Sequence, residues 1–383
     1  MKIALVIERM DPFRGGRETS TAQIAADLAR RGHDVTVLCQ SGAWQQEGVT
    51  VLPLGRGRLT RRGALKHFAR NVQHEIDWGA FDVVHGTLPI PGVNVYQPRS
   101  GTVPGQRQAD LRRRGARGRA LRRLTGRLNR RRALMAEMER RVLADKNVWC
   151  LPGSRMVANE IERYYRRIDR VRVVFNAVDV PEMSDRRRAE NRRRVRDALG
   201  AGQETVVFLT LATNWALKGV AESIVAFAEW RRRRMRPLDA RLVLLGCASR
   251  GTYQRLAASH NVADHVVMDG PVEDVAPWYA AADACVLLTW YDPCSRVVLE
   301  ATRLGVPSIT TAYNGASEAL ADGAGLVVPS PADTPVVIEA FETLADGARR
   351  ARAADACRNQ ARRLAIDRHV DHLLRAYAEA APS

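Results

Sequence analysis

The stretch IALVIERMDPFRGGRETSTAQIAADLARRGHDVTVL, residues 3–38, decides the fold. An apolar run at residues 3–7 predicts a strand, and Gly15 and Gly16 lie in the loop that follows it. Ile24 and Leu28, four residues apart, predict the buried stripe of a helix that ends before Gly32. A second apolar run covers residues 35–38. Strand, helix and strand in this order predict a parallel βαβ unit.

The same alternation continues outward from this unit. Strands are expected at 49–52 and 82–85, and three prolines indicate a loop over 86–98. After a long helical stretch a second series begins with a strand at 171–175. It continues with strands at 206–211, 242–245, 266–268, 284–288 and 308–311 and helices at 220–234 and 295–304. Short strands alternating with helices predict two α/β domains, each Rossmann-like and doubly wound, with a boundary near residue 175.

The composition agrees with two domains and excludes several classes of protein. The chain has 383 residues and is 46% hydrophobic, which is too apolar for a disordered protein. No apolar run approaches the ~18–20 residues of a membrane span, and residues 1–9 lack the features of a signal peptide, so a cytoplasmic protein is expected. Six cysteines without a C-x-x-C pair indicate neither a disulfide framework nor a zinc site.

The net charge of +18 favours a polyanionic partner. Residues 107–132 hold twelve arginines and one acid, and the interleaved leucines predict a basic amphipathic helix that glycines interrupt. Two smaller arginine runs, at 186–196 and 231–236, are expected to form solvated helix faces.

One loop and the helix after it could carry chemistry. The sequence Asp292-Pro293-Cys294-Ser295-Arg296-Val297-Val298-Leu299-Glu300 follows the strand expected at 284–288. An acid in the loop then precedes a helix that starts near Ser295, and a helix N-terminus is a ready site for an anion. An ordinary βα turn with a surface acid fits the spacing equally well.

With Ala301 and Gly305-Val306-Pro307 added, this segment resembles the signature of the retaining family 4 glycosyltransferases of GT-B fold. That signature has two acids eight residues apart, then Ala, then Gly-x-Pro. Asp292 stands where the family usually has Glu. Four further segments resemble family motifs in the expected order: Gly15-Gly16, residues 176–179, Lys218-Gly219 and residues 314–318.

The resemblance implies two Rossmann-like domains that face each other across a cleft. Residues 1–175 would bind the acceptor and carry a basic, membrane-facing segment at 101–132. Residues 176–365 would bind the nucleotide sugar, and a helix at 366–383 would cross back to the first domain. Catalysis is expected after the domains close.

The resemblance also implies roles for individual residues. Lys218 would neutralise the leaving diphosphate. The N-terminus of the helix that starts near Ser295 would help, with its first residues Arg296 and Val297. Asp292 would hold the donor sugar and Glu300 the ribose. Further candidates are Gly15 and Gly16 on the donor side, Asp11 and Glu18 on the acceptor side, and His85 as a catalytic or acceptor-side residue; structural roles for these three side chains stay open. No Asp-x-Asp motif occurs, so no metal is expected.

Among subfamilies, residues 91–96, the arginine-rich segment and Tyr164-Tyr165 resemble the lipopolysaccharide core glucosyltransferases that act on a lipid-linked heptose. The expectation is therefore metal-independent transfer, without a cofactor, from a UDP- or GDP-sugar to a lipid-linked saccharide. The enzyme would be a peripheral protein on the inner face of the cytoplasmic membrane. It would be a monomer without a nucleic-acid partner, with these arginines facing anionic lipid: Arg112, Arg113, Arg114, Arg122 and Arg123.

Three other classes of protein compete with this interpretation. A dinucleotide-dependent oxidoreductase or epimerase lacks its G-x-G-x-x-G fingerprint after residues 3–7. A nucleic-acid binder would explain the charge, but the arginine runs lack interleaved aromatics. A catalytically impaired member of the family is suggested by Asp292, by Ala177, and by the absence of a basic residue shortly before Lys218.

Overall fold

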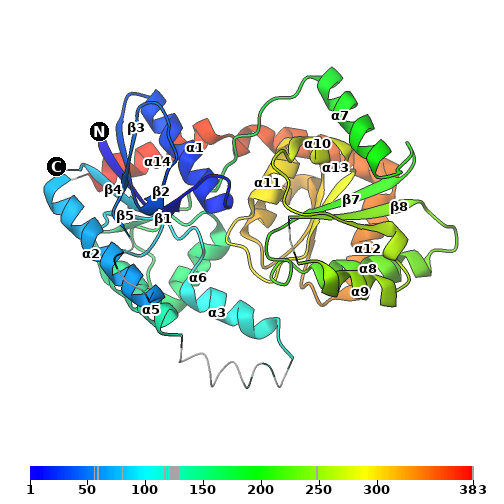
Figure 1. The fold of residues 1–383 in the computed structure, drawn as a ribbon, viewed down its shortest axis with the longest axis horizontal. Coiled ribbons are helices and arrows are strands. Elements are labelled where there is room, and N and C mark those ends of the chain that lie inside the picture. The colour runs from blue at the N-terminus through cyan, green and yellow to red at the C-terminus, as the bar shows by residue number, and fades with distance from the viewer. Residues whose placement is uncertain are drawn as a thin grey trace. The chain divides into compact units, whose positions relative to one another are not determined.

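The computed structural model describes residues 1–55, 57, 60–79, 81–115, 118, 120, 129–246 and 249–381. It divides into two compact units (Figure 1). Unit 1 consists of Met1–Asp179 and Ala365–Ser383, and unit 2 of Val180–Leu364. Each unit is built on a parallel sheet covered by helices on both faces, so the expected α/β, doubly wound, Rossmann-like architecture is confirmed.

The sheet of unit 1 has the strand order β3-β2-β1-β4-β5-β6. Its strands are β1 (Lys2–Met10), β2 (Asp34–Gly42), β3 (Val49–Pro53), β4 (Val83–Gly86), β5 (Val95–Tyr96) and β6 (Trp149–Cys150). Two expectations are wrong here. Residues 86–98 contain β5 as well as loop, and residues 171–175 form no strand, because only Val171 bridges to Cys150.

Both faces of this sheet are buried. Alternate residues of β1 enter different cores: Ile3, Leu5 and Ile7 pack on one face, and Ala4 and Val6 on the other. The first core lies under α1 (Gly16–Arg30) and α14 (Ile366–Ala380). The second lies under α2 (Arg61–Gly79), α5 (Arg130–Ala144) and α6 (Arg155–Tyr165) (Figure 1). The C-terminal helix α14 is therefore a structural part of unit 1.

The sheet of unit 2 has the order β12-β11-β10-β7-β8-β9. Its strands are β7 (Val206–Leu211), β8 (Ala240–Leu245), β9 (Val266–Met268), β10 (Ala284–Leu287), β11 (Ser308–Thr311) and β12 (Gly325–Val328). The helices are α7 (Asp185–Ala198), α8 (Val220–Arg233), α9 (Gly251–Ser259), α10 (Ala276–Ala281), α11 (Arg296–Arg303), α12 (Thr334–Ala345) and α13 (Gly347–Gln360), with the short η2 (Ala263–His265), η3 (Gly315–Gly323) and η4 (Ala361–Leu364).

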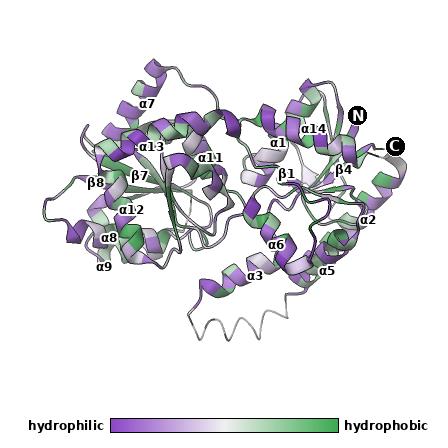
Figure 2. Ribbon diagram, turned by 180° about the vertical axis from the view of Figure 1, so that it is seen from behind, coloured by the Kyte–Doolittle hydropathy of each residue, from purple (hydrophilic) through white to green (hydrophobic). Residues whose placement is uncertain are grey.

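Helix α7 carries the arginine run 186–196 and is hydrophilic along much of its length (Figure 2). The expectation that the whole run is solvated is wrong. Arg196 is 4% exposed and donates to the carbonyl oxygens of Ala281 and Gly202, at 3.1 and 2.6 Å, and to Asp283. Arg192 bonds the same Asp283 at 2.8 Å. These arginines satisfy carbonyls at the end of α10 that would otherwise lack donors.

The long basic segment does not form one helix in its described part. Helix α3 (Val103–Arg112) ends at Arg112, and Arg113 caps it. Asp110 lies within ion-pair distance of Arg113 (3.6 Å) and Arg114 (3.2 Å). Arg122 and Arg123 lie outside the described residues. Within the described part of the chain, no helix has the length and apolar character needed to cross a membrane.

Candidate functional site

The candidate site of unit 2 lies where its strand order reverses, between β7 and β10. Ligands of doubly wound sheets bind beyond the carboxyl ends of the strands at this point. Lys218 follows β7 and Asp292 follows β10, and the Lys218 ammonium contacts Oδ2 of Asp292. Their side chains are 21% and 13% exposed, so the ion pair is partly accessible to a ligand. The backbone N–H of Cys294 donates to the other Asp292 oxygen at 3.2 Å.

Gly219 makes the position of Lys218 possible. Its φ of 67° lies in the left-handed region, and a Cβ atom there would lie 1.9 Å from the carbonyl oxygen of Leu288. The backbone N–H of Trp290 donates to the carbonyl oxygen of Leu217 at 2.9 Å, and this bond joins the turn to the segment after β10. The Thr289 hydroxyl donates to the same oxygen at 3.2 Å. The turns after β7 and β10 therefore form one rigid block.

Asn314 fixes the start of α11. Its side chain is fully buried, and its oxygen accepts from the backbone N–H groups of Ser295 and Ala316, at 3.2 and 3.0 Å. Its amide nitrogen donates to the Thr310 hydroxyl at 2.9 Å. The Asp292 backbone also joins this loop, since its N–H and C=O bond Tyr313 and Gly315. The helix N-terminus and Asp292 are thus held in register with each other.

Glu300 is held from two sides, one turn into α11. The Arg296 guanidinium donates to Oε1 at 3.0 Å, and the Tyr279 hydroxyl donates to Oε2 at 3.1 Å. Burial, followed by the charge of Glu300, raises the pKa of Tyr279 well above its usual value, so this hydroxyl stays protonated. Tyr279 also donates to the carbonyl oxygen of Val297 at 3.2 Å, and the Val297 side chain packs against the core.

The structure therefore brings Lys218, Asp292, Ser295, Arg296 and Glu300 together around the start of α11. The arrangement offers a cation and a helix N-terminus to an anion, and oriented carboxylates to hydroxyl groups. Sequence reasoning missed Tyr279 and the anchoring role of Asn314. Asn314 lies in the motif-like segment 314–318, but its anchoring role has no signal of its own, and Tyr279 lies in no motif.

The candidates in unit 1 take different positions. Asp11 is exposed, and its carboxylate accepts a hydrogen bond from the backbone N–H of Phe13 in the same loop, at 3.2 Å. Gly15 has an extended φ of 170°, which any residue adopts, and Gly16 begins α1. Glu18 is 7% exposed and pairs with Arg17 at 2.9 Å. All of them lie in or beside the loop after β1.

His85 is a buried residue of unit 1 in this structure. It is 1% exposed on β4, and its Nδ1 hydrogen-bonds the Tyr377 hydroxyl of α14. Burial, and next the charge of Arg99, lower its pKa to about 3, so the ring is neutral. Nε2 has no hydrogen-bond partner in the described part of the chain. The hydrogen bond to Tyr377 fits a structural role, and the catalytic role expected of His85 stays a prediction.

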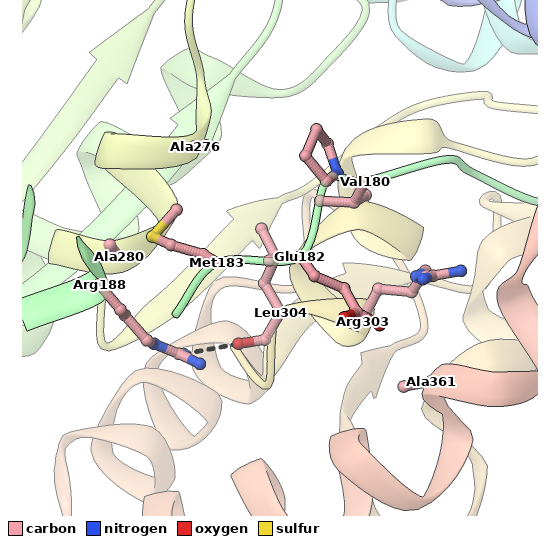
Figure 3. Close-up of a pocket in the computed structure, with 10 residues that line it drawn as sticks. Val180, Glu182, Met183, Arg188, Ala276, Ala280, Arg303, Leu304 and Ala361 are labelled. Atoms are coloured by element: carbon pink, nitrogen blue, oxygen red, sulfur yellow. Dashed lines mark hydrogen bonds between the residues drawn. The ribbon is translucent and has the colours of Figure 1, made fainter. Parts of the chain in front are cut away.

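A separate cavity of about 310 Å³ lies at the other end of α11 (Figure 3). Arg303 and Leu304 line it, together with Met183 from the segment before α7. Arg188 of α7 donates to the Leu304 carbonyl oxygen at 2.6 Å, the bond drawn in Figure 3. This contact satisfies a carbonyl at the C-terminus of α11 and so supports the helix that carries Arg296 and Glu300.

Two families of known proteins match the chain. Residues 14–182 match "Glycosyltransferase Family 4", and residues 203–346 match "Glycosyl transferases group 1". A D-inositol 3-phosphate glycosyltransferase of Xylanimonas cellulosilytica is 31% identical over 242 residues, which is 60% of this chain and 56% of that protein. The lipopolysaccharide glucosyltransferase WaaG of Escherichia coli (strain K12) is 25% identical over 342 residues, 86% of either chain.

Solved structures show the same fold. A crystal structure of WaaG superposes with a TM-score of 0.77 at 22% identity, covering 97% of this chain and 98% of that one. Anabaena Alr3699/HepE in complex with UDP-glucose superposes with a TM-score of 0.74 at 16% identity, covering 99% and 100%. The match to the D-inositol 3-phosphate glycosyltransferase spans little more than half of that relative's length.

Proposed function

Because the chain belongs to the group 1 and family 4 glycosyltransferases of GT-B fold, we propose that it transfers a sugar from a nucleoside diphosphate donor to a hydroxyl of a lipid-linked saccharide. The observation that carries this proposal is the Lys218–Asp292 pair at the strand-order reversal of unit 2, beside the N-terminus of α11. UDP-glucose is the donor of choice for testing, since a structural relative is described in complex with it.

The chemistry explains the choice of side chains. The glycosyl–phosphate bond breaks with positive charge building on the sugar and negative charge on the diphosphate. A bound diphosphate competes with Asp292 for the Lys218 ammonium, and the freed carboxylate then accepts hydrogen bonds from the sugar hydroxyls. Glu300, held by Arg296 and Tyr279, keeps lone pairs for the two ribose hydroxyls.

Retention of configuration and independence from metal ions are part of the proposal. Lys218 and the start of α11 supply positive charge to the leaving group without a divalent cation. The acceptor is assigned to unit 1. A lipid-linked saccharide such as lipopolysaccharide core is supported by the relative named a lipopolysaccharide glucosyltransferase, which aligns over 86% of both chains.

A transfer assay with UDP-glucose and lipopolysaccharide core acceptor tests the reaction. By proton NMR, the product should carry the α-configuration of the donor. An excess of EDTA should leave the rate unchanged. Lys218→Ala should lower the rate by roughly a hundredfold or more. A wild-type protein that binds donor and transfers nothing to any saccharide would indicate the catalytically impaired alternative, and an inverted product would contradict retention.

Association with anionic membrane is proposed from the charge of residues 107–132. Each arginine near such a surface contributes about 1 kcal/mol, so replacing Arg112, Arg113 and Arg114 by Gln should weaken vesicle binding by up to about a hundredfold. The matched control replaces Arg186, Arg187 and Arg193, which are exposed on α7 in unit 2. Equal loss from both triple variants in a sedimentation assay with phosphatidylglycerol vesicles would assign the effect to net charge alone.

A further inference from the structure

Unit 1 contains a cavity of about 450 Å³ that four arginines line, and we call it the basic cavity. The arginines are Arg17, Arg61, Arg131 and Arg132. We propose that the basic cavity binds a phosphorylated saccharide, with the arginines on the phosphate group. Its assignment to the acceptor rests on the proposed function, whereas the cavity and its charge do not.

The basic cavity occupies the ligand position of its own sheet. The strand order of unit 1 reverses between β1 and β4. Glu8, near the end of β1, and Thr87, directly after β4, both line the cavity. It therefore lies beyond the carboxyl ends of the strands at the reversal, where doubly wound sheets bind ligands. Its volume is in the range that holds small molecules, roughly 300–1,000 Å³.

Two acids, Glu8 and Glu139, line the cavity beside the four arginines, so the lining has more basic than acidic groups. Arg131 pairs with Glu8 at 2.8 Å and Arg17 with Glu18 at 2.9 Å. Arg132 reaches Asp110 at 3.6 Å, but Arg113 and Arg114 share that same carboxylate.

Arg61 makes no ion pair with any residue that the structure describes. The lining of the cavity thus carries an excess of positive charge.

The other walls suit a sugar. Ser100, Gln106 and Tyr96 line the cavity with polar groups, and Gln106 is oriented by its bond to the Ser100 carbonyl oxygen at 2.9 Å. At the base, the buried Glu139 accepts from the Tyr96 hydroxyl at 3.0 Å and from the Val103 N–H at 2.8 Å. Polar side chains beside an arginine cluster match a sugar that carries a phosphate, since guanidinium groups bind phosphate through paired hydrogen bonds.

This placement changes the interpretation of part of the arginine-rich segment. Arg131 and Arg132 belong to the range 101–132 expected to face the membrane, yet they line the basic cavity of unit 1. Their charge is therefore assigned to a small anionic ligand. The shared chemistry is phosphate, which a soluble sugar phosphate or a lipid headgroup could present, and the experiment separates these sources.

Calorimetric titrations of the full chain at constant ionic strength use glucose 6-phosphate, glucose and inorganic phosphate. Glucose 6-phosphate should bind at least tenfold more tightly than glucose. Arg61→Ala should weaken its binding about tenfold and Arg61→Lys less. Arg62 is exposed like Arg61 but does not line the cavity, so Arg62→Ala should bind as the wild type does. Sedimentation with phosphatidylglycerol vesicles is the lipid arm, and Arg61→Ala should leave vesicle binding unchanged.

Several results would overturn the proposal. They are equal affinity for glucose and glucose 6-phosphate, equal effects of Arg61→Ala and Arg62→Ala, or an Arg61→Ala effect confined to vesicles. A UDP-glucose titration keeps the two proposals distinguishable. If the protein binds glucose 6-phosphate but does not bind UDP-glucose, the proposed function is contradicted and the proposal for the basic cavity is supported.

Discussion

The substitution Gly219→Ala tests the construction of the site most sharply. At this position φ is 67°, and an alanine Cβ would lie 1.9 Å from the Leu288 carbonyl oxygen. A left-handed φ costs a non-glycine residue about 1–2 kcal/mol, and relieving a backbone overlap of this size adds roughly 1–3 kcal/mol. The expected loss in the free energy of unfolding is therefore about 3 kcal/mol.

Gly200 provides the matched control, because its φ is 58° and an added Cβ would meet nothing within 4 Å. Gly200→Ala should lose only the conformational part, about 1–2 kcal/mol. Urea unfolding of unit 2, followed by tryptophan fluorescence, measures the difference between the two variants. Gly219→Ala should also weaken UDP-glucose binding, since Lys218 must move. Equal destabilisation by the two variants would refute the close contact with Leu288, and unchanged donor affinity would refute its link to Lys218.

Two further predictions concern single side chains. Tyr279→Phe removes one hydrogen bond to Glu300 and should raise the KM for the donor about five- to tenfold with little change in kcat; a change confined to kcat would contradict a positioning role. Burial, and next Arg99, lower the pKa of His369 to about 3 from 6.5, so its contribution to stability is present above pH 6.5 and is lost as the pH falls toward 3. When the pH falls from 7.5 to 5.0, the free energy of unfolding should fall by about 2 kcal/mol less in His369→Gln than in the wild type. Urea unfolding measures this difference, and the same pH dependence in both proteins would contradict the prediction.

Most strands of the two sheets could be predicted because they are short apolar runs that alternate with helical segments. Three strands escaped prediction: β5 and β6, which have two residues each, and the four-residue β12. Strand β5 lies among prolines, and β6 precedes the segment 171–175 that was expected to be a strand. Such short pairings depend on the neighbouring strands rather than on local pattern, so the sequence shows no period for them.

The candidate donor-site residues Lys218, Asp292 and Glu300 were indicated by their resemblance to family motifs, because their spacing fits an ordinary βα turn equally well. The residues that hold them in place could not be predicted. Tyr279 lies before β10 and reaches Glu300 only through the fold. The exposure of the arginines of α7 was predicted wrongly for the same reason. A run such as 186–196 is typical of a solvated face, yet Arg196 is buried because the end of α10 presents carbonyl oxygens that need donors.

We propose that unit 2 binds a nucleotide sugar between Lys218 and the start of α11. Calorimetric titration of UDP-glucose into the wild type and Lys218→Ala measures this binding. Exchanging a charge-assisted contact to the diphosphate for a methyl group should weaken binding roughly tenfold to a hundredfold. Undiminished affinity in Lys218→Ala would contradict the account.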